Sequence, residues 1–392
     1  MKKHNRRIYL IIILMINFIL TGCWDNYELD TISIVTGLGI DAAENDDEIN
    51  LTLQVDKIKG DTGYEKGDIG PSSSFLIMNT TDKGILSAID KLERQTPRSI
   101  FLHHNQVIVF GKEQVKKGIK KHMDVFIREH QMRMETWVLV SDGTAKEILS
   151  TPMEQEENSS IGLSKMIFSG SRDYESFSVK LIDLTSRLME ETTSPVIPII
   201  TAKNEGGSSK VEISGLAVLK GDKYIGELDL EKVRGYSWIM GNCRETPLDI
   251  NTEYGYIDAS ISNIKLKNKP KFGADGPFIS IDFKGDVTIR EIQGFEGMNT
   301  EKTFAILQKA CVEQLKKEIL DCFNYSQDLN ADIYGFGEEF YRRYPKDFER
   351  MKEYWDEIYP ELDMKIEVAL EVTDTGKVLN SLYMEEQSDE NR

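Results

Sequence analysis

The sequence predicts an α+β fold with mixed sheets, packed helices and two main domains, the N-terminal one open to further division. Apolar residues alternate with polar ones in several short stretches, as in residues 49–55, and this two-residue period is typical of half-buried strands. Elsewhere apolar residues recur every three or four positions, as in residues 303–322, which indicates amphipathic helices. A polar Gly/Ser-rich segment at 204–210 divides these patterns into two sets.

The N-terminal set begins with two strands expected within 34–57 and a third at 75–78. Thr81 and Asp82 can cap a helix after them, because short polar side chains accept hydrogen bonds from free backbone N–H groups. The apolar stripe of this helix would be Ile85, Leu86, Ile89 and Leu92. The other expected elements are a strand at 100–110, a helix at 113–128, a strand at 135–140 and helices at 144–149 and 177–190.

The C-terminal set opens with a hairpin formed by 213–219 and 224–228, and long strands follow near 254–266 and 278–290. The helix at 303–322 and a strand at 364–372 complete it. We therefore expect a signal peptide at 1–22, an N-terminal domain at 23–200, a linker at 201–210, a C-terminal domain at 211–380 and a polar tail at 381–392.

The first residues form a processing signal rather than part of the fold. Lys2, Lys3, Arg6 and Arg7 give a positively charged start, and residues 8–20 are almost entirely apolar. A helix of this length rises only about 20 Å, less than the roughly 30 Å of a bilayer core. A cleaved signal peptide therefore fits this stretch better than a permanent membrane span.

Leu20-Thr21-Gly22-Cys23 follows directly and resembles the lipobox of bacterial lipoproteins. In that motif small residues admit a peptidase, and the cysteine sulfur accepts a diacylglyceryl group. We expect cleavage before Cys23, lipidation of its thiol and a position on the extracytoplasmic face of a membrane. The alternative is an unrelated cysteine behind an ordinary signal peptide.

The charge balance excludes nucleic acid as an expected partner. The full chain has a formal charge of −18, and removal of residues 1–22, which carry four positive charges and no negative ones, makes it −22. Such a surface repels phosphate backbones, and no basic stripe with interleaved aromatic residues is present. An acidic body also gains nothing from anionic headgroups, so membrane attachment is expected from the lipid alone.

The cysteines after Cys23 do not suggest a disulfide framework, because only Cys243, Cys311 and Cys322 remain. Cys311 and Cys322 fall on one face of the predicted helix but about 16 Å apart along its axis. A disulfide requires Cα atoms within about 7 Å. We expect buried thiols.

No catalytic, cofactor-binding or metal site is expected. Gly37-Leu38-Gly39 and Gly335-Phe336-Gly337 lack the third glycine of a dinucleotide-binding loop. His103 and His104 are adjacent in a predicted strand, so their side chains should point to opposite faces and cannot share a metal. The sequence also contains no HExxH and no Gly-x-Ser-x-Gly motif, and it therefore favours a protein that is not an enzyme.

Several stretches in order resemble the spore-germination C-subunit lipoproteins, the Ger(x)C family. They cover nearly the whole chain, and each is weak alone. The stretches are Gly22-Cys23-Trp24-Asp25 with Glu28-Leu29, Gly37-Leu38-Gly39-Ile40-Asp41, Ile197-Pro198, Gly215-Leu216-Ala217-Val218 running to Gly226 and Leu228, and Ala331-Asp332-Ile333-Tyr334-Gly335-Phe336-Gly337 with Tyr344-Pro345 and Trp355. Ala331 departs from the family, which favours Ser at this place.

The resemblance implies a non-enzymatic subunit of a nutrient germinant receptor, lipid-anchored on the outer face of the spore inner membrane. Its partners would be two integral-membrane subunits of the same receptor. From the residues alone, Asp332 is a candidate cap for a helix at Ile333 or part of a partner-binding epitope. Two other functions stay open: a solute-binding lipoprotein of a transporter, which would need two doubly wound lobes, and an extracytoplasmic enzyme.

Overall fold

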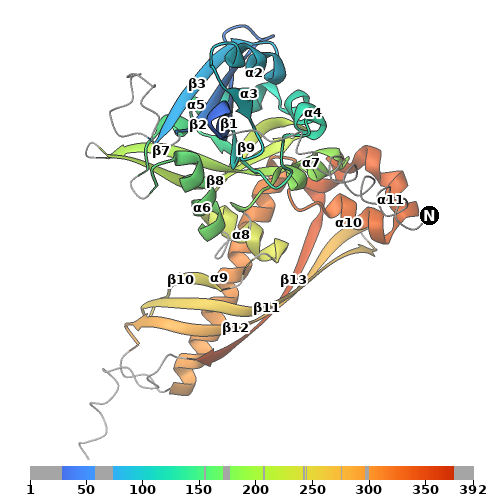
Figure 1. Ribbon diagram of the computed structural model, residues 1–392. Coiled ribbons are helices and arrows are strands. Elements are labelled where there is room, and N and C mark those ends of the chain that lie inside the picture. The colour runs from blue at the N-terminus through green and yellow to red at the C-terminus, as the bar shows by residue number, and fades with distance from the viewer. Residues whose placement is uncertain are drawn as a thin grey trace, which may run out of the picture.

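The computed structural model describes residues 29–57, 74–153, 156–170, 177–205, 208–241, 243, 245–274, 276–295 and 300–374. These residues form two sheet systems with helices packed on them, which confirms the predicted α+β class. Figure 1 shows the N-terminal sheet as the upper body and the C-terminal sheet with the long helix α9 below it. The predicted signal peptide, Cys23 and the tail at 381–392 lie outside the described residues.

The N-terminal sheet has the strand order β3-β2-β1-β5-β6-β7-β8-β9, and β4 pairs with β1 beside this path. Its centre is parallel, from β1 through β5 and β6 to β7, whereas the strands at both ends run antiparallel to their neighbours. The strands are β1 (Ile32–Ala42), β2 (Ile49–Asp56), β3 (Phe75–Asp82), β4 (Ser99–Phe101), β5 (Val107–Gly111), β6 (Trp137–Ser141), β7 (Val196–Glu205), β8 (Ser208–Lys220) and β9 (Lys223–Asp229).

Helices cover both faces of this sheet. Helices α2 (Ile85–Glu93), α3 (Lys112–Lys117), α4 (Lys120–Arg128) and α7 (Leu181–Met189) bury apolar side chains in one core. Helices α5 (Ala145–Ser150) and α6 (Ser159–Gly170) pack over a second, smaller core on the other face. Central parallel strands need such crossover helices, which explains why strands and helices alternate between residues 85 and 205.

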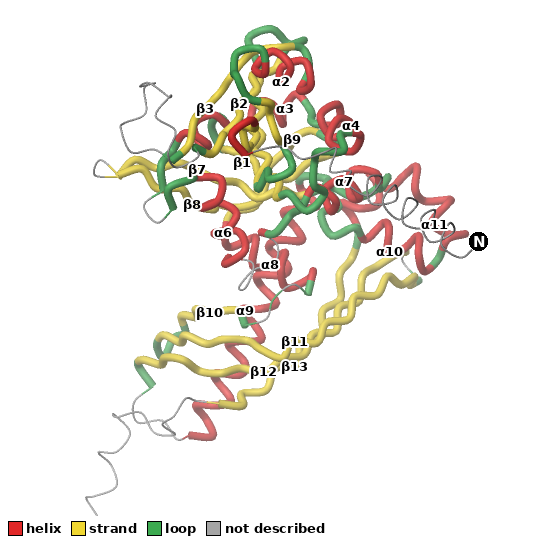
Figure 2. Tube along the Cα trace, in the orientation of Figure 1, coloured by secondary structure: helices red, strands yellow, loops and turns green. Residues whose placement is uncertain are grey.

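The C-terminal part has a four-stranded sheet in the order β10-β11-β12-β13, namely β10 (Thr246–Asn251), β11 (Tyr256–Gly273), β12 (Gly276–Gln293) and β13 (Asp363–Asp374). Helices α8 (Leu230–Met240) and α9 (Thr300–Asp328) pack together against it. The short helices α10 (Phe336–Arg343), α11 (Pro345–Met351) and α12 (Trp355–Ile358) then lead to β13. β13 is parallel to β12, because this long helical crossover separates them. Figure 2 shows these elements by type.

The linker predicted at 201–210 is wrong, since the structure pairs residues 201–205 with residues 208–212 within one sheet. Lys203 opposes Lys210 and Asn204 opposes Ser209 in an antiparallel hairpin of β7 and β8. The hairpin predicted at 213–228 exists but extends the N-terminal sheet as β8 and β9. A short polar segment rich in glycine and serine serves equally well as a hairpin turn, and only the pairing partners decide which it becomes.

Other predicted elements were displaced or divided. The strand expected at 100–110 is two strands with a turn between them, and the helix expected at 113–128 divides at Gly118, whose φ is +109°. Helix α2 begins after Gly84 rather than at a Thr81 or Asp82 cap, and Leu86 is 44% exposed while Ala88 takes its place in the core. Helices α6 and α8 were not predicted. No helix of the described residues is long and apolar enough to cross a membrane.

Candidate functional site

The predicted placement of His103 and His104 in a strand is wrong. His103 and His104 lie in the turn between β4 and β5, not in a strand, and both rings contact Phe101, at centroid distances of 4.6 and 5.8 Å. His122 is buried, and this burial lowers its pKa to about 4. Among the described residues no group of three or more His, Cys, Asp or Glu side chains could hold a metal ion.

The Gly37-Leu38-Gly39-Ile40-Asp41 stretch forms a structural contact. A Cβ at Gly37 would lie 2.0 Å from Ser160 Oγ, so the glycine allows α6 to approach β1 closely. Asp41 accepts hydrogen bonds from the backbone N–H groups of Ala145 at 2.7 Å and Lys146 at 3.0 Å. These are the first two residues of helix α5, so Asp41 satisfies two N–H groups that have no partner within the helix. These residues therefore hold helices on the sheet.

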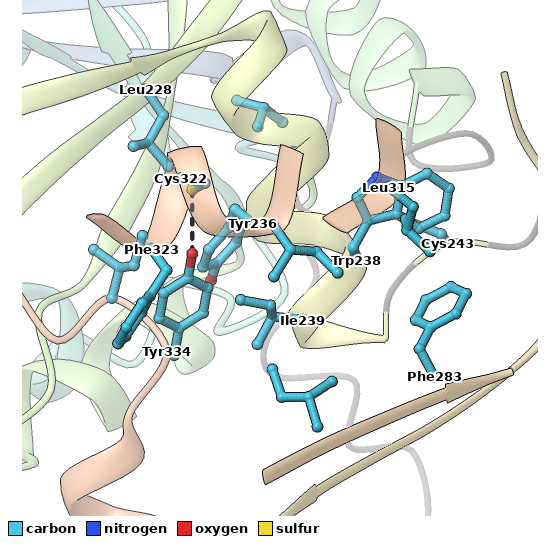
Figure 3. Packing of buried hydrophobic residues seen from close by; sticks show 14 of the residues in the cluster. Leu228, Tyr236, Trp238, Ile239, Cys243, Phe283, Leu315, Cys322, Phe323 and Tyr334 are labelled. Carbon is cyan, nitrogen blue, oxygen red and sulfur yellow. Dashed lines mark hydrogen bonds between the residues drawn. The ribbon is translucent and has the colours of Figure 1, made fainter. Parts of the chain in front are cut away.

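The three described cysteines are buried and unbridged, as expected. Cys322 accepts a hydrogen bond from the Tyr334 hydroxyl at 3.2 Å, in the core drawn in Figure 3. Burial raises the pKa of the Cys243 and Cys311 thiols to about 11. Because the thiolate is the reactive form, these side chains are packing groups.

Asp332 is the least exposed carboxylate of the described residues. Its side chain is buried, with 3% exposure, and it accepts three hydrogen bonds: from the backbone N–H of Phe336 at 2.9 Å, from that of Gly337 at 2.8 Å and from Trp355 Nε1 at 3.2 Å. Burial is the largest influence on this carboxyl and raises its pKa to about 6, against the opposing effect of these donors. The helix predicted at Ile333 is wrong, because α10 begins at Phe336 with Gly335 as its N-cap residue. The Asp332 carboxylate instead accepts the first two N–H groups of α10 from outside the helix.

The segment around Asp332 joins the two halves of the chain. Its carbonyl accepts the backbone N–H of Ser194, from the segment between α7 and β7, at 2.9 Å. Arg187 on α7 donates to the Ile333 carbonyl at 3.2 Å. Gly335 has a φ of +72°, which favours glycine, and this turn brings Thr193 against the start of α10.

A cleft of about 240 Å³ lies beside this joint. One wall comes from the segment after α7, the second from the β8–β9 turn, and the third from the C-terminal part. The lining residues are Glu191, Thr192, Thr193, Ser194, Lys220, Gly221, Asn330, Asp332, Trp355, Asp356 and Tyr359. We call this feature the joint cleft. The sequence pointed to Asp332 and Trp355, but nothing in it placed the threonines opposite them, because residues 192 and 332 meet only through the fold.

Lys220, the last residue of β8, connects the N-terminal sheet to the C-terminal part beside the joint cleft. Its ammonium donates to the Asn330 carbonyl at 2.8 Å and pairs with Asp356 at 2.9 Å. Asn330 in turn donates its side-chain amide to the Asp356 carbonyl at 2.9 Å. The cleft is thus framed by contacts that tie the end of β8 to the C-terminal helices.

Comparison with known proteins identifies the family. A family model described as the spore germination protein N-terminal domain matches residues 25–202, and one described as spore germination B3/GerAC like, C-terminal, matches residues 214–376. The chain belongs to the Ger(x)C spore germination family. The two matches meet at the hairpin of β7 and β8, so the joint cleft combines residues of both family domains.

Relatives within this family match along almost their whole length. Putative spore germination protein YfkR of Bacillus subtilis (strain 168) is 26% identical over 376 residues, covering 93% of this chain and 96% of the relative. Spore germination protein KC of the same organism is 24% identical over 392 residues, covering 93% and 95%. The crystal structure of the GerBC protein is 19% identical, covers 89% of this chain and 99% of its own, and superposes with a TM-score of 0.57, so the fold is shared.

Proposed function

We propose that this member of the Ger(x)C family is a non-enzymatic, lipid-anchored subunit of a nutrient germinant receptor. Family membership supports a role in spore germination, and the ordered match of both domain models along the chain is the observation that carries the proposal. In this proposal Cys23 bears the lipid, and the body lies on the outer face of the spore inner membrane. Its partners are two integral-membrane subunits of the same receptor.

The chemistry of the described residues supports binding as the task of the body. Its most buried carboxylate, Asp332, is engaged in capping a helix and holding an indole. Its thiols are buried, and burial raises the pKa values of Cys243 and Cys311 to about 11. A catalytic role would instead call for reactive groups that face a substrate-sized opening.

The competing functions fit the fold less well. A solute-binding lipoprotein would need two doubly wound lobes, whereas the C-terminal sheet has three antiparallel strands in sequence order and one parallel strand at its edge. An extracytoplasmic enzyme would need an arrangement of catalytic side chains, and we identify none among the described residues.

The anchor has a physical role in this proposal. Two acyl chains hold a protein stably at a bilayer, because each buried methylene contributes about 0.8 kcal/mol. Confinement at the surface raises the effective concentration of the body for membrane-embedded partners, so contacts of modest strength are sufficient.

Gene deletion tests the receptor assignment. Spores that lack this protein should fail to respond to particular nutrients yet still germinate with chemical triggers that bypass receptors. The strain should also lack paralogous receptors for the same nutrients. A normal rate with every nutrient in that background would contradict the proposal.

Lipid attachment is tested separately. Labelled palmitate should mark the wild-type chain and leave a Cys23→Ala variant unmarked, and label in the variant would exclude Cys23 as the site. Because an uncleaved signal can still tether that variant, a version with a cleavable non-lipid signal is the better functional comparison. We expect a weaker nutrient response from the released body; an unchanged response would remove the anchor from the mechanism while leaving the receptor assignment standing.

A further inference from the structure

One face of the C-terminal sheet carries six lysines on three neighbouring strands, β11, β12 and β13 (Figure 1). On β11, Ile264 and Leu266 pack against the core, so the residues that alternate with them point to the opposite face of the sheet. The pairing register places residues of β12 and β13 beside them on this outer face. We call it the lysine face, and its lysines are Lys265, Lys267, Lys269, Lys271, Lys284 and Lys365. Five of them are exposed, and Lys269 is half-buried.

These lysines are not neutralised by the chain itself. The lysine face also carries three carboxylates, Asp282, Asp363 and Glu367, so positive charge is in excess. Even so, within the part of the chain that the structure describes none of the six lysines forms an ion pair. Lys112 in the N-terminal sheet, by contrast, pairs with two carboxylates. The ammonium groups of the lysine face therefore remain available to an anion.

The arrangement of the lysines works against the stability of the sheet. Lys265 and Lys284 are directly opposite each other on β11 and β12, and like charges in such a pair are destabilising. Lys267 and Lys269 follow on the same face at two-residue steps, about 7 Å apart along the strand. In a chain whose formal charge is −18, unpaired lysines gathered in this way indicate a surface that meets a negatively charged partner.

The residue types indicate which kind of anionic partner fits. All six cations are lysines, whereas arginine is the residue whose planar group matches single carboxylates and phosphates with a fixed geometry. Lysine is a point charge on a flexible stem, so this face favours a high density of negative charge over one particular group. Phe278 lies among the lysines, with the ammonium groups of Lys365 and Lys271 at 4.4 and 6.0 Å from its ring centroid. A surface of anionic lipid headgroups offers such a density across three strands.

The other half of the same sheet face is acidic. It begins at an irregularity between Ser262 and Lys265, and its outer side carries Asp258, Asp286 and Glu291. A bulge bends a strand and increases its local twist, so the acidic half turns away from the plane of the lysine face. A second copy of the chain could set its acidic half against the lysine face, but two bodies of this net charge repel each other.

We propose that the lysine face binds the anionic headgroups of a phospholipid bilayer, as a second membrane contact beside the lipid on Cys23. This inference rests on the proposed function, which places the body at a bilayer surface. The acidity of the whole chain, from which we expected attachment by the lipid alone, does not prevent the contact. At about 0.1 M salt, charges more than about 10 Å from the headgroups are largely screened, so the bilayer interacts with the nearby lysines rather than with the net charge.

The test is co-sedimentation of the unlipidated chain, residues 24–392, with vesicles of phosphatidylglycerol or of phosphatidylcholine at about 0.1 M salt. Each lysine near an anionic surface strengthens binding about fivefold. Since part of this gain is offset by the three carboxylates, we expect binding to phosphatidylglycerol to be at least about tenfold tighter, and to weaken as salt is added. The assay contains no receptor, so its failure would leave the gene-deletion test of the receptor assignment unaffected.

A triple variant with Lys265→Gln, Lys267→Gln and Lys284→Gln locates the contact. It leaves three lysines and three carboxylates on the lysine face, so the preference for phosphatidylglycerol should disappear. Its melting temperature should not fall, because no ion pair is lost and one like-charge pair is removed.

The matched control replaces three exposed lysines of the N-terminal part, with Lys83→Gln, Lys121→Gln and Lys223→Gln. It changes the net charge by the same amount and should keep the preference of the wild type. Loss of the preference in both triple variants would overturn the proposal, because binding would then follow net charge and not the lysine face.

A preference that is lost in the lysine-face variant and kept in the control supports the proposal. Equal binding to the two kinds of vesicle, or no binding to phosphatidylglycerol, would overturn it. Binding of a soluble oligoglutamate peptide without binding of vesicles would overturn it in favour of an acidic protein partner. A dimer in sedimentation equilibrium that the lysine-face variant does not form, again without binding of vesicles, would overturn it in favour of a second copy of the chain.

Discussion

Replacing Asp332 tests how a buried carboxylate contributes to the stability of the fold around the start of α10. Asp332→Ala leaves three buried donors unpaired: two backbone N–H groups at the start of α10 and the indole N–H of Trp355. Each unpaired donor costs about 1–3 kcal/mol, although such losses are not additive. The carboxylate itself also carries a cost, since its pKa rises from 3.8 to about 6 on folding, and each pKa unit corresponds to about 1.4 kcal/mol.

This shift fixes the sign of the pH dependence. The folded state holds the Asp332 proton more tightly than the unfolded chain, so its contribution to stability is largest below pH 3.8 and falls as pH rises towards 6. Between pH 4 and pH 7.5 the loss amounts to about 2–3 kcal/mol. Asp332→Asn has a similar shape and does not titrate, so it lacks this component.

The assay is urea denaturation of the wild type and Asp332→Asn at pH 4 and pH 7.5. We expect the wild type to exceed the variant in free energy of unfolding by more at pH 4 than at pH 7.5, since changes in other groups cancel between the two proteins. Asp332→Ala should be less stable than Asp332→Asn at both pH values. A wild-type advantage that grows with pH would refute the reasoning, because the three donors would then outweigh burial and favour the charged form.

Three further predictions follow from packing and composition. Gly235→Ala should lower the free energy of unfolding by about 1–3 kcal/mol despite the higher helix propensity of alanine, because its Cβ would lie 2.2 Å from the Glu318 carbonyl oxygen. Gly170→Ala is the control, since its Cβ would have no neighbouring atom closer than 3.8 Å, and equal melting temperatures of the two variants would contradict this prediction. A fragment starting at residue 209 should self-associate in size-exclusion chromatography, because it exposes the edge of β8 that β7 covers, and a monomer would count against that. Elemental analysis of unchelated protein should find no stoichiometric zinc or iron, and either metal would show that we have missed a site.

The sequence predicted most of the elements in which apolar residues recur with a single period, either two residues for a strand or three to four for a helix. The strands at 49–55 and 364–372 and the long helix at 303–322 are present as β2, β13 and α9. Helix α8 was not predicted, because most of its residues are buried and its apolar and polar residues form no single stripe. His103 and His104 were placed in a strand because the turn that interrupts residues 100–110 contains no glycine or proline.

The candidate site was predicted only in part, for a different reason. The family resemblance drew attention to Asp332 and Trp355, which do lie in contact. The other wall of the joint cleft comes from Thr192 and Thr193, about 140 positions before Asp332. Residues this far apart in the chain meet only through the fold, so no local pattern of the sequence predicts their contact.

The Gly215-Leu216-Ala217-Val218 stretch shows how one strand connects the two family domains. Successive side chains of a strand point to opposite faces, so a strand exposed on one side needs an apolar residue only at every second position. Here Leu216 and Val218 lie in the core shared with α8, α9 and the C-terminal sheet, while Ala217 and Leu219 lie in the core of the N-terminal sheet. Every position after the glycine is apolar because both faces are buried. The continuous apolar run after the predicted linker is therefore the result of one strand serving two cores, and a separation of the halves at this strand would expose both.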